Sequence, residues 1–332
     1  MSMVYIGIDL GGTNIATGLV DEKGALLRKR SIPTRAPRPA REIVQDISQV
    51  IDELLAESGL DRSDLGGVGM GVPSPVDPKT STLLHAYNLG LQNVDFPALL
   101  EEVFPGVRLN IDNDADCAVY GEYICGSAAG YEQVFMFTLG TGVGSGVILD
   151  GRLFRGGTGY GIEPGHTIIV KDGQLCSCGK FGCLDAYASV YGVRYATKTV
   201  LEGRMDLPAW FVDQAGSDPS RVDPRTVFGA AEDREPCALA IVDLYTTYLA
   251  IGVCNALVSY RPEILLIGGG IGDAGEILLE GLRMKVDQEL PMSDGIPKVP
   301  IEACRLGNDA GIIGAALLSR DLKGQAACSK ED

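Results

Sequence analysis

The segments IDLGGTNIATGLVD (8–21) and FTLGTGVGSGVILD (137–150) decide the fold class of this chain. Each begins with an apolar run, passes through a Leu-Gly turn rich in glycine and threonine, continues as a second apolar run and ends on Asp. The two segments are 129 positions apart (137 minus 8). Because apolar runs separated by glycine turns are typical of β-hairpins, the repeat predicts two related lobes. The alternative is that any two glycine-rich hairpins look alike.

The residues around both hairpins predict α/β lobes. Apolar runs predict a three-stranded meander in each lobe, and Asp150-Gly151 fits a tight turn. The meanders cover 4–8, 15–21 and 25–32, and then 133–139, 144–150 and 152–154. Further strands are expected at 66–72, at 107–111 and at 262–272, the last running into a glycine turn; helices are expected over 40–58, from about 115, over 237–260 and over 310–320. Residues 201–236 are polar and are expected to be the least regular interior segment.

The composition limits the partners of this protein. Its 332 residues include 28 Lys and Arg against 44 Asp and Glu, which gives a net charge of −16. Nucleic acids and anionic membranes attract clustered basic surface, so neither is expected as a partner. The nine cysteines are odd in number, and no secretory signal precedes the first strand. No apolar run approaches the roughly 18 residues of a membrane span, although LAIGVCNALV (249–258) comes nearest. We therefore expect a protein of the reducing cytoplasm.

The segment EPGHTIIVKDGQLCSCGKFGCLD (163–185) gathers one histidine and three cysteines. They are His166, Cys176, Cys178 and Cys183. Zinc favours imidazole and thiolate ligands in a tetrahedron, so the set is complete for a structural site. The alternative is that the thiols are buried as small apolar side chains. Glu163 and Asp185 flank the set, and the segment is therefore expected to position carboxylates and an imidazole for a polar ligand.

Three glycine-rich turns each follow an expected strand: DLGGTN (9–14), LGTGVGSG (139–146) and IGGGIG (267–272). Backbone N–H groups in such turns can approach phosphate oxygens closely. None is a Walker A loop, because no Lys-Ser/Thr follows. One such turn alone is typical of ordinary loops, but three in one chain favour anion binding. Asp9 ends the first strand, where its carboxylate fits either a hydrated magnesium ion or a bond to its own turn.

The segment IDNDADCAVYGE (111–122) joins an expected strand to an expected helix. Asn113 or Asp114 fits the helix N-cap, which is the interpretation that the residues alone favour. Asp114 also fits a general base that takes the proton of a hydroxyl attacking phosphorus. Both roles can hold at neighbouring residues.

With these motifs in this order, the chain resembles the ROK family of sugar kinases (repressor, open reading frame, kinase) over essentially its whole length. The resemblance is carried by GIDLGGTN (7–14), GVPSPVD (71–77), Asn88-Leu89, NDAD (113–116), GTGVGSG (140–146), EPGH (163–166), CSCGKFGC (176–183), VFGAAEDREPCA (227–238), IGGG (267–270) and GNDAGIIGAA (307–316). It implies an α/β, two-lobed actin/hexokinase-like (ribonuclease H-like) fold with duplicated βββαβα lobes and a zinc knuckle. Residues 1–113 with about 308–325 would form the N-terminal lobe, 114–307 with the zinc-binding segment 163–185 the C-terminal lobe, and 326–332 a polar tail.

The resemblance also implies a role for each matching position. Asp114 matches the catalytic base. The sugar would be bound by Asn113, Asp114, Glu163, His166 and Asp185, with Asn88 as a weaker match. Phosphate contacts match Asp9, Gly11, Gly12, Thr13, Asn14, Thr141 and Gly142, and the adenosine side matches Gly268, Gly269 and Gly270. His166, Cys176, Cys178 and Cys183 match the zinc ligands.

Three positions depart from the family pattern. Asp185 stands where Glu is usual, Pro164 replaces an aliphatic residue, and Ser74 stands where Gly is common. Each would lie near the sugar, so they leave the identity of the sugar open.

The resemblance implies an ATP-dependent sugar kinase whose lobes close over MgATP and a hexose. Asp114 would draw the proton from a primary hydroxyl, and glucose is the first expected substrate. N-acetylmannosamine, N-acetylglucosamine, allose and fructose are the alternatives. Structural Zn²⁺, Mg²⁺ with ATP, and a homodimer or homotetramer are expected. A repressor relative would carry a helix-turn-helix before the kinase-like body, for which the strand at Val4 leaves no room. A non-catalytic sugar sensor is disfavoured by the presence of Asp9 and Asp114.

Overall fold

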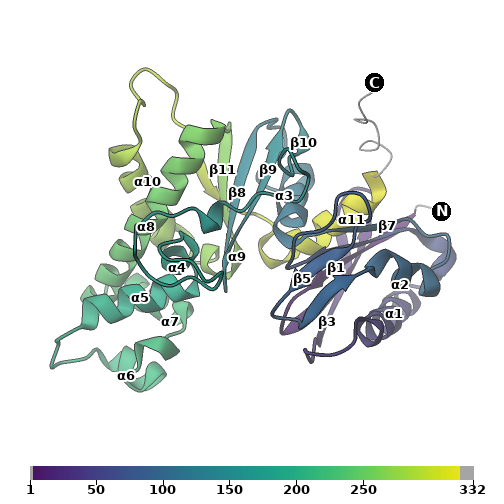
Figure 1. Cartoon of the computed structure of the whole chain (residues 1–332), viewed down its shortest axis with the longest axis horizontal. Coiled ribbons are helices and arrows are strands. Elements are labelled where there is room, and N and C mark those ends of the chain that lie inside the picture. The colour runs from purple at the N-terminus through teal and green to yellow at the C-terminus, as the bar shows by residue number, and fades with distance from the viewer. Residues whose placement is uncertain (1–2, 322–332) are drawn as a thin grey trace. The chain divides into compact units, whose positions relative to one another are not determined.

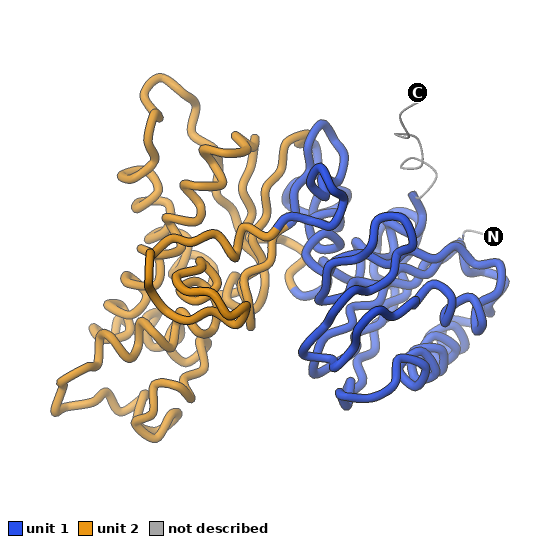
Figure 2. The backbone as a smooth tube through the Cα atoms, in the orientation of Figure 1, with its two compact units in different colours: residues 1–130, 146–162, 308–332 blue, residues 131–145, 163–307 orange. Residues whose placement is uncertain are grey.

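The computed structural model describes residues 3–321. The chain divides into two compact units, which Figure 2 shows in different colours. Within the described residues, unit 1 comprises 3–130, 146–162 and 308–321, and unit 2 comprises Tyr131–Ser145 and Glu163–Gly307. Residues 322–325, which the resemblance places in the N-terminal lobe, and the expected tail 326–332 lie outside the described residues.

Unit 1 is built on a five-stranded sheet with the order β3-β2-β1-β4-β7. Figure 1 labels β1, β3 and β7 among its strands. Its strands are β1 (Val4–Leu10), β2 (Asn14–Asp21), β3 (Leu26–Pro33), β4 (Leu65–Val72) and β7 (Leu109–Asn113). β1, β2 and β3 pair as an antiparallel meander, whereas β1, β4 and β7 run parallel. A two-stranded hairpin, β5 (Leu83–Ala86) and β6 (Leu91–Val94), is separate from this sheet.

The two faces of this sheet differ because side chains alternate along a strand. Ile6 and Ile8 of β1 join the core that Ile43 and Ile47 of helix α1 (Ala40–Glu57) complete. The opposite face carries Gly7, where a Cβ would lie 1.8 Å from the carbonyl oxygen of Ile312. Helix α11 (Ala310–Asp321) therefore packs with its backbone directly against the strand. The unit also contains helices α2 (Phe96–Val103) and α3 (Asp114–Cys125) and the turn η1 (Arg62–Asp64).

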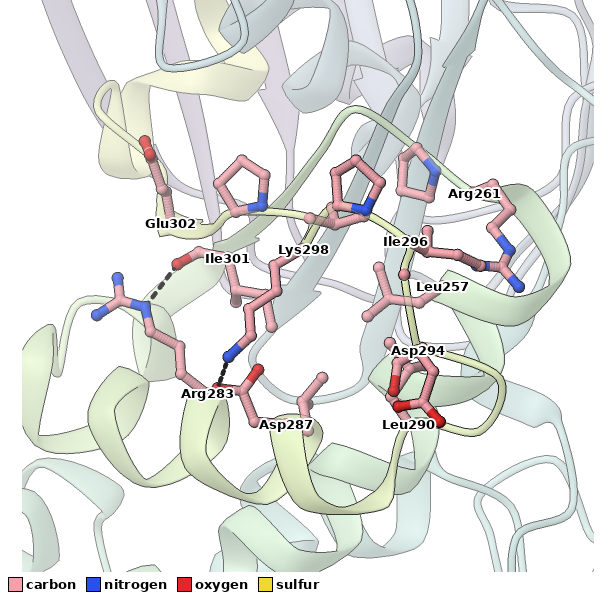
Figure 3. A pocket seen from close by; sticks show the side chains of 17 residues that line it. Leu257, Arg261, Arg283, Asp287, Leu290, Asp294, Ile296, Lys298, Ile301 and Glu302 are labelled. Atoms are coloured by element: carbon pink, nitrogen blue, oxygen red, sulfur yellow. Dashed lines mark hydrogen bonds and ion pairs between the residues drawn. The ribbon is translucent and has the colours of Figure 1, made fainter.

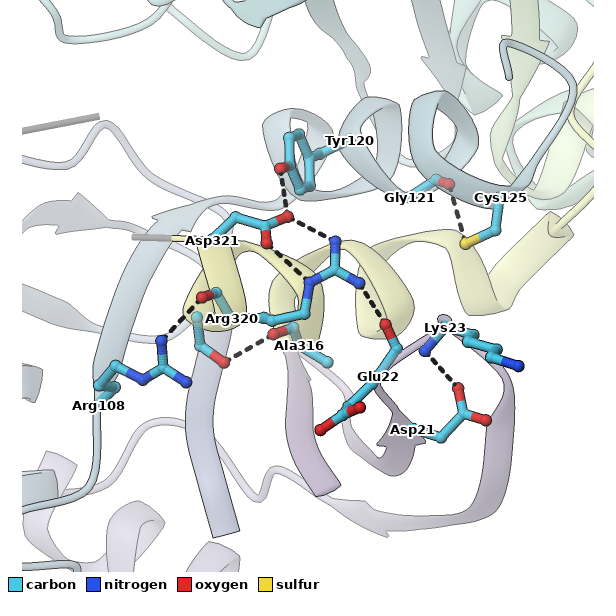
Figure 4. A network of polar contacts seen from close by, with 11 residues as sticks. Asp21, Glu22, Lys23, Arg108, Tyr120, Gly121, Cys125, Ala316, Arg320 and Asp321 are labelled. Atoms are coloured by element: carbon cyan, nitrogen blue, oxygen red, sulfur yellow. Dashed lines mark hydrogen bonds and ion pairs between the residues drawn. The ribbon is translucent and has the colours of Figure 1, made fainter. Parts of the chain in front are cut away.

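Polar contacts fix the end of α11 in unit 1 (Figure 4). The hydroxyl of Tyr120 donates to Asp321 at 2.7 Å, and Arg320 pairs with the same carboxylate at 2.7 Å. Arg108 donates to the carbonyl of Arg320 at 2.9 Å. Burial alone would raise the pKa of Asp321, yet the hydrogen bonds from Arg320 and Tyr120 leave that pKa lowered. The last described helix is thus tied to α3 and to the residue before β7.

Unit 2 holds most of a second five-stranded sheet, with the order β10-β9-β8-β11-β12. Its strands are β8 (Val134–Leu139), β9 (Val143–Leu149), β10 (Arg152–Leu153), β11 (Ile264–Gly268) and β12 (Ile301–Ala303). Counted in chain order, each strand takes the place of its counterpart in the first sheet, with β8 in the place of β1 and β12 in the place of β7. β8, β11 and β12 again run parallel. The predicted repeat of the two hairpins is therefore confirmed at the level of sheet topology.

Helices account for most of the rest of unit 2. They are α4 (Asp185–Ala188), α5 (Val190–Leu201), α6 (Ala209–Ala215), α7 (Pro224–Glu232), α8 (Pro236–Tyr260), α9 (Gly269–Gly272) and α10 (Glu276–Glu289), with turns η2 (Pro164–His166), η3 (Pro219–Arg221) and η4 (Gly307–Asp309). The segment 201–236 is more regular than expected, because Asp218 and Asp223 cap η3 and α7 and a proline follows each cap.

Helix α8 corrects the expectation that no apolar run approaches the length of a membrane span. It has 25 residues and a window of mean hydropathy 1.7, so it is long and apolar enough by those measures alone. Of that window, 61% is buried inside the protein, and α8 packs against α5, α7 and α10. A core helix meets the same criteria, and this packing is that of a core helix.

The lobe boundary expected at residue 114 also differs from the observed one. Residues 114–130 and 146–162 lie in unit 1 rather than with the second sheet's remaining chain. The reason is close packing of α3 on α11, where a Cβ on Gly314 would lie 1.6 Å from the carbonyl oxygen of Cys117. Two helices that approach this closely through glycine belong to one compact unit.

Candidate active site

The predicted residues of unit 1 gather at one edge of its sheet. In the parallel register Asp9 of β1 is level with Gly71 of β4, and Gly71 is level with Asp112 of β7. The carboxyl ends of these three strands therefore meet there, which is where open α/β sheets bind ligands. The turn 11–14 follows β1, and Asn113 and Asp114 follow or end β7.

The turn 11–14 is held by its own sheet. The N–H of Gly11 donates to the carbonyl of Asn14 at 3.0 Å, and the N–H of Thr34 donates to the carbonyl of Thr13 at 2.8 Å. The hydroxyl of Thr34, a fully buried residue, donates to the carbonyl of Gly11 at 2.6 Å. This anchor from the end of β3 was not predicted from the sequence.

Asn88 and Ser74 lie in loops of unit 1. Asn88 is exposed and lies beside the glycine turn, since a Cβ on Gly12 would be 3.0 Å from its amide nitrogen. Ser74 is buried, accepts from the N–H of His85 at 3.1 Å and donates to the carbonyl of Pro75 at 2.8 Å. The serine that replaces the usual glycine thus ties its loop to β5.

The carboxylate of Asp9 lies at the end of β1 beside the start of α11, where a Cβ on Gly311 would be 3.9 Å away. Burial raises the pKa of Asp9, and the positive charge of Lys29 partly offsets this. Lys29 forms an ion pair with Asp309. A partly buried carboxylate with a raised pKa at a ligand-binding edge is a candidate functional residue.

Asn113 and Asp114 divide the two roles that the sequence left open. Asn113 caps α3, because its side-chain oxygen accepts from the N–H groups of Ala115 at 2.9 Å and Asp116 at 3.3 Å. Asp114 is the first residue of the helix, and its Oδ1 also accepts from Ala115 at 2.8 Å. Since Asn113 provides the cap, Asp114 is not needed for it.

A partly buried ion pair lies next to these two residues. The guanidinium of Arg155 pairs with the carboxylate of Asp112 and donates from Nε at 3.2 Å. Asp112 also accepts from the N–H of Asn113 at 3.0 Å. The pair therefore fixes the strand end from which Asn113 and Asp114 project. Sequence reasoning missed it, because the partners are 43 positions apart.

In unit 2, the four predicted metal ligands come together. The ligand atoms of His166, Cys176, Cys178 and Cys183 all lie within 4.8 Å of one another. Nδ1 of His166 is 3.6 Å from Sγ of Cys176, and Sγ of Cys178 is 3.7 Å from Sγ of Cys183. A Zn–S bond of about 2.3 Å places the sulfurs of a tetrahedron about 3.8 Å apart, so the arrangement fits zinc. Burial and the neighbouring thiols raise the pKa of Cys183 to about 12, so ion binding would release its proton.

Asp185 lies beside this cluster but is turned into the protein. The residue is 4% exposed. Its Oδ2 accepts from the N–H of Val143 at 2.8 Å, and its Oδ1 is 3.7 Å from Sγ of Cys176. The described contacts of Asp185 are therefore with a glycine turn and with a cysteine of the cluster.

Glu163 and Pro164 begin the short segment that carries His166. Glu163 is exposed and precedes η2, whose first residue is Pro164. A proline at this position suits a helical turn because its φ is already fixed. Gly165 packs closely on β9, where its Cβ would lie 2.1 Å from the carbonyl oxygen of Val143. The unusual proline therefore rigidifies the segment between Glu163 and His166.

Both remaining glycine turns lie at one edge of the second sheet. Gly268 of β11 is level with Thr138 of β8 in the parallel register, so turns 139–143 and 268–270 are neighbours. A Cβ on Gly269 would lie 2.5 Å from the carbonyl oxygen of Leu139. Gly270 is exposed with open space around it. Thr141 and Gly142 are therefore on the same edge as the expected adenosine-side glycines.

A pocket elsewhere in unit 2 contains none of these residues (Figure 3). It has a volume of about 810 Å³ and is lined by the end of α8, by α10 and by 293–302. Lys298 pairs with Asp287 across it at 2.5 Å, and Arg283 donates to the carbonyl of Ile301 at 2.8 Å. Size alone does not make it the active site, because the carboxylates, glycine turns and metal ligands lie elsewhere.

Comparison with known proteins agrees with this arrangement. The model of the ROK family matches residues 5–322. The chain belongs to the ROK family. A glucokinase of Halalkalibacterium halodurans is 34% identical over 318 residues, which cover 95% of this chain and 94% of that protein. The crystal structure of a ROK family glucokinase from Streptomyces griseus in complex with glucose and AMPPNP superposes with a TM-score of 0.82, at 31% identity, over 96% of this chain and 99% of the other.

Members of this family differ in function. A xylose repressor of Caldicellulosiruptor bescii is 28% identical over 310 residues, which are 93% of this chain but 76% of the repressor. Family membership thus establishes the actin/hexokinase-like sugar kinase fold, and the choice among activities has to come from the site.

Proposed function

We propose that this protein is an ATP-dependent hexose kinase that phosphorylates glucose at its primary hydroxyl to give glucose 6-phosphate. The glucokinase relatives, matched over almost their whole length, support this activity. The observation in the structure that carries the proposal is the division of roles at the start of α3. Asn113 caps the helix, and Asp114, the first helical residue, is placed at the carboxyl edge of the sheet, where a general base is expected.

Asp114 would accept the proton of the sugar hydroxyl as that oxygen attacks the γ-phosphate. The partly buried Arg155–Asp112 pair holds the strand end, and the cap holds the helix start, so the carboxylate of Asp114 is positioned from both sides. We assign the sugar hydroxyls to Asn88, Asn113, Glu163 and His166, in addition to Asp114.

The nucleotide would be bound by the glycine turns. We assign its phosphates to turn 11–14 and to Thr141 and Gly142, and its adenosine side to 268–270. Mg²⁺ would enter with ATP near Asp9, whose partly buried carboxylate suits a hydrated cation. His166, Cys176, Cys178 and Cys183 would hold a structural Zn²⁺, which supplies folding energy rather than chemistry.

Other hexose or N-acetylhexosamine kinases remain second candidates because Asp185, Pro164 and Ser74 depart from the family pattern. A repressor is disfavoured by the net charge of −16, since DNA binding needs basic surface. We further propose a cytoplasmic homo-oligomer, a dimer or tetramer, on family resemblance.

A coupled ADP-release assay with MgATP tests the proposal. Glucose, fructose, allose, N-acetylglucosamine and N-acetylmannosamine would be compared at equal concentrations, with 6-phosphate identified by mass spectrometry. We expect glucose to give the highest kcat/KM. Turnover on another sugar would replace the substrate but keep the reaction, whereas no ADP release on any sugar would overturn the proposed activity.

A further inference from the structure

We propose that Asp185 is a positioning residue through which the Cys/His cluster holds the glycine turn 140–143, so that metal occupancy controls the affinity of this turn for the nucleotide phosphates. The identity of the ligand rests on the proposed function. The mechanical link itself rests only on contacts within unit 2.

The turn 140–143 is anchored by the segment that follows the cluster. The N–H of Val143 donates to Oδ2 of Asp185 at 2.8 Å, and the carbonyl of Gly140 accepts from the N–H of Val190 at 2.9 Å. Both anchors come from 185–190, which begins two residues after the ligand Cys183. Fixing Cys183 on a metal therefore fixes the start of this segment.

The segment 163–166, which carries the histidine of the cluster, also contacts Val143. His166 ends the turn η2, and Gly165 within it packs on the carbonyl oxygen of Val143. The segments that follow His166 and Cys183 are bonded to each other, since the N–H of Leu184 donates to the carbonyl of Thr167 at 2.9 Å. The N–H of Val143 is thus held by Asp185, which follows the cysteines, and its carbonyl packs against Gly165, which precedes His166.

The length of Asp185 suits this position. A Cβ on Gly142 would lie only 2.9 Å from Oδ2, and the side chain is enclosed by the turn and by Cys176. A glutamate would be one methylene longer in a space that is already filled. The aspartate in place of the family's glutamate therefore fits a residue that bonds the turn rather than one that reaches outward.

The test compares Asp185→Ala with Asp185→Asn, whose amide oxygen can still accept from Val143. In the full-length, zinc-loaded protein without substrates, we expect Asp185→Ala to speed amide exchange of peptides covering 139–144 by about tenfold and to raise the Kd for Mg-AMPPNP about tenfold, the loss of one hydrogen bond to a charged group. The Kd for glucose and the zinc content should not change. Asp185→Asn should fall between wild type and Asp185→Ala, and it remains informative if the alanine variant does not fold.

Removal of zinc by a chelator provides a second test. Removing zinc from the wild type should speed exchange of 139–144, and the same treatment should have less than about half of that relative effect in Asp185→Ala, because coupled contacts are not additive. An equal effect in both proteins would overturn the proposal. A rise in the glucose Kd of Asp185→Ala, with unchanged amide exchange and AMPPNP binding, would also overturn it and would make Asp185 a sugar ligand. Loss of zinc from Asp185→Ala would overturn it as well. Exchange and zinc content stay readable even if no sugar supports ADP release, so failure of the proposed function is distinguishable.

Discussion

The turns 11–14 and 140–143 occupy the same place in two sheets of the same order, yet they are held in different ways. The first is anchored by Thr34, which belongs to the end of its own meander. The second is anchored by Asp185 and Val190, which follow the cysteines of the 163–185 segment. The comparison teaches that two hairpins can share one topology while residues from different parts of the chain anchor their turns.

The two edges also differ in chemistry. The edge in unit 1 carries the carboxylates of Asp9, Asp112 and Asp114, whereas the edge in unit 2 carries turns 139–143 and 268–270. We therefore expect changes in unit 1 to act on the chemical step and changes in unit 2 to act on binding and stability.

The largest expected effect is that of Asp114→Asn. Loss of the general base should lower kcat by about 10²–10⁴-fold and leave the glucose Kd within about twofold, which calorimetry can measure. Asp172→Asn, the same change at an exposed carboxylate, is the matched control and should be neutral. Retained turnover in Asp114→Asn would break the assignment of chemistry to unit 1.

Zinc removal should have the next largest effect and should act on unit 2. Chelation or Cys178→Ser is expected to lower the melting temperature by about 5–10 °C, because a structural metal contributes folding free energy. Cys125→Ser is the control, since a serine hydroxyl can still donate to the carbonyl of Gly121. Full activity and unchanged melting in a protein shown to contain no zinc would contradict the structural role.

Thr34→Val tests the anchor of turn 11–14 in unit 1. The variant leaves the carbonyl of Gly11 without its buried donor, at a cost of about 1–3 kcal/mol in the free energy of unfolding. Thr34→Ser keeps the hydroxyl and should retain most of the stability. Amide exchange should rise in peptides covering 11–14 and not in those covering 139–144. Equal changes in both turns would show that the anchors are not independent.

Asp9→Asn should have the smallest effect on stability, and its sign depends on pH. Burial raises the pKa of Asp9 above its ordinary value of 3.8, so the folded protein binds a proton that the unfolded chain has lost, and stability falls as pH rises through this window. The variant should therefore melt higher than wild type at pH 7 without ligand, with the difference vanishing below pH 4. Saturating MgATP should reverse the order at pH 7, because Asp9 then serves the cation. A variant that gains as much from MgATP as wild type would refute that role.

Local patterns in the sequence predicted the parts of the fold that local physics determines. The apolar run 4–8 and the helix expected over 40–58 supply Ile6, Ile8, Ile43 and Ile47 to the observed core. The spacing of one histidine and three cysteines predicted the cluster, because zinc ligation restricts both residue type and distance.

The rest could not be read from local patterns because it depends on contacts between distant residues. The bond from Val143 to Asp185 spans 42 positions and the Arg155–Asp112 pair spans 43. The hairpin of β5 and β6 and the helices α2, α5 and α10 were not predicted either. The unusual Asp185 and Ser74 did mark positions where such contacts occur, so a departure from a family pattern was the available signal.

The close packing of Gly7 on Ile312 has a consequence for the making of the protein. One face of the first sheet is covered by α11, whose residues leave the ribosome last among those described here. A nascent chain ending near residue 307 would present the glycine-lined face of β1 and β4 without its cover. The packing of this sheet face must then wait until α11 has been synthesised, and until then the nascent chain exposes an uncovered face of the kind that chaperones bind.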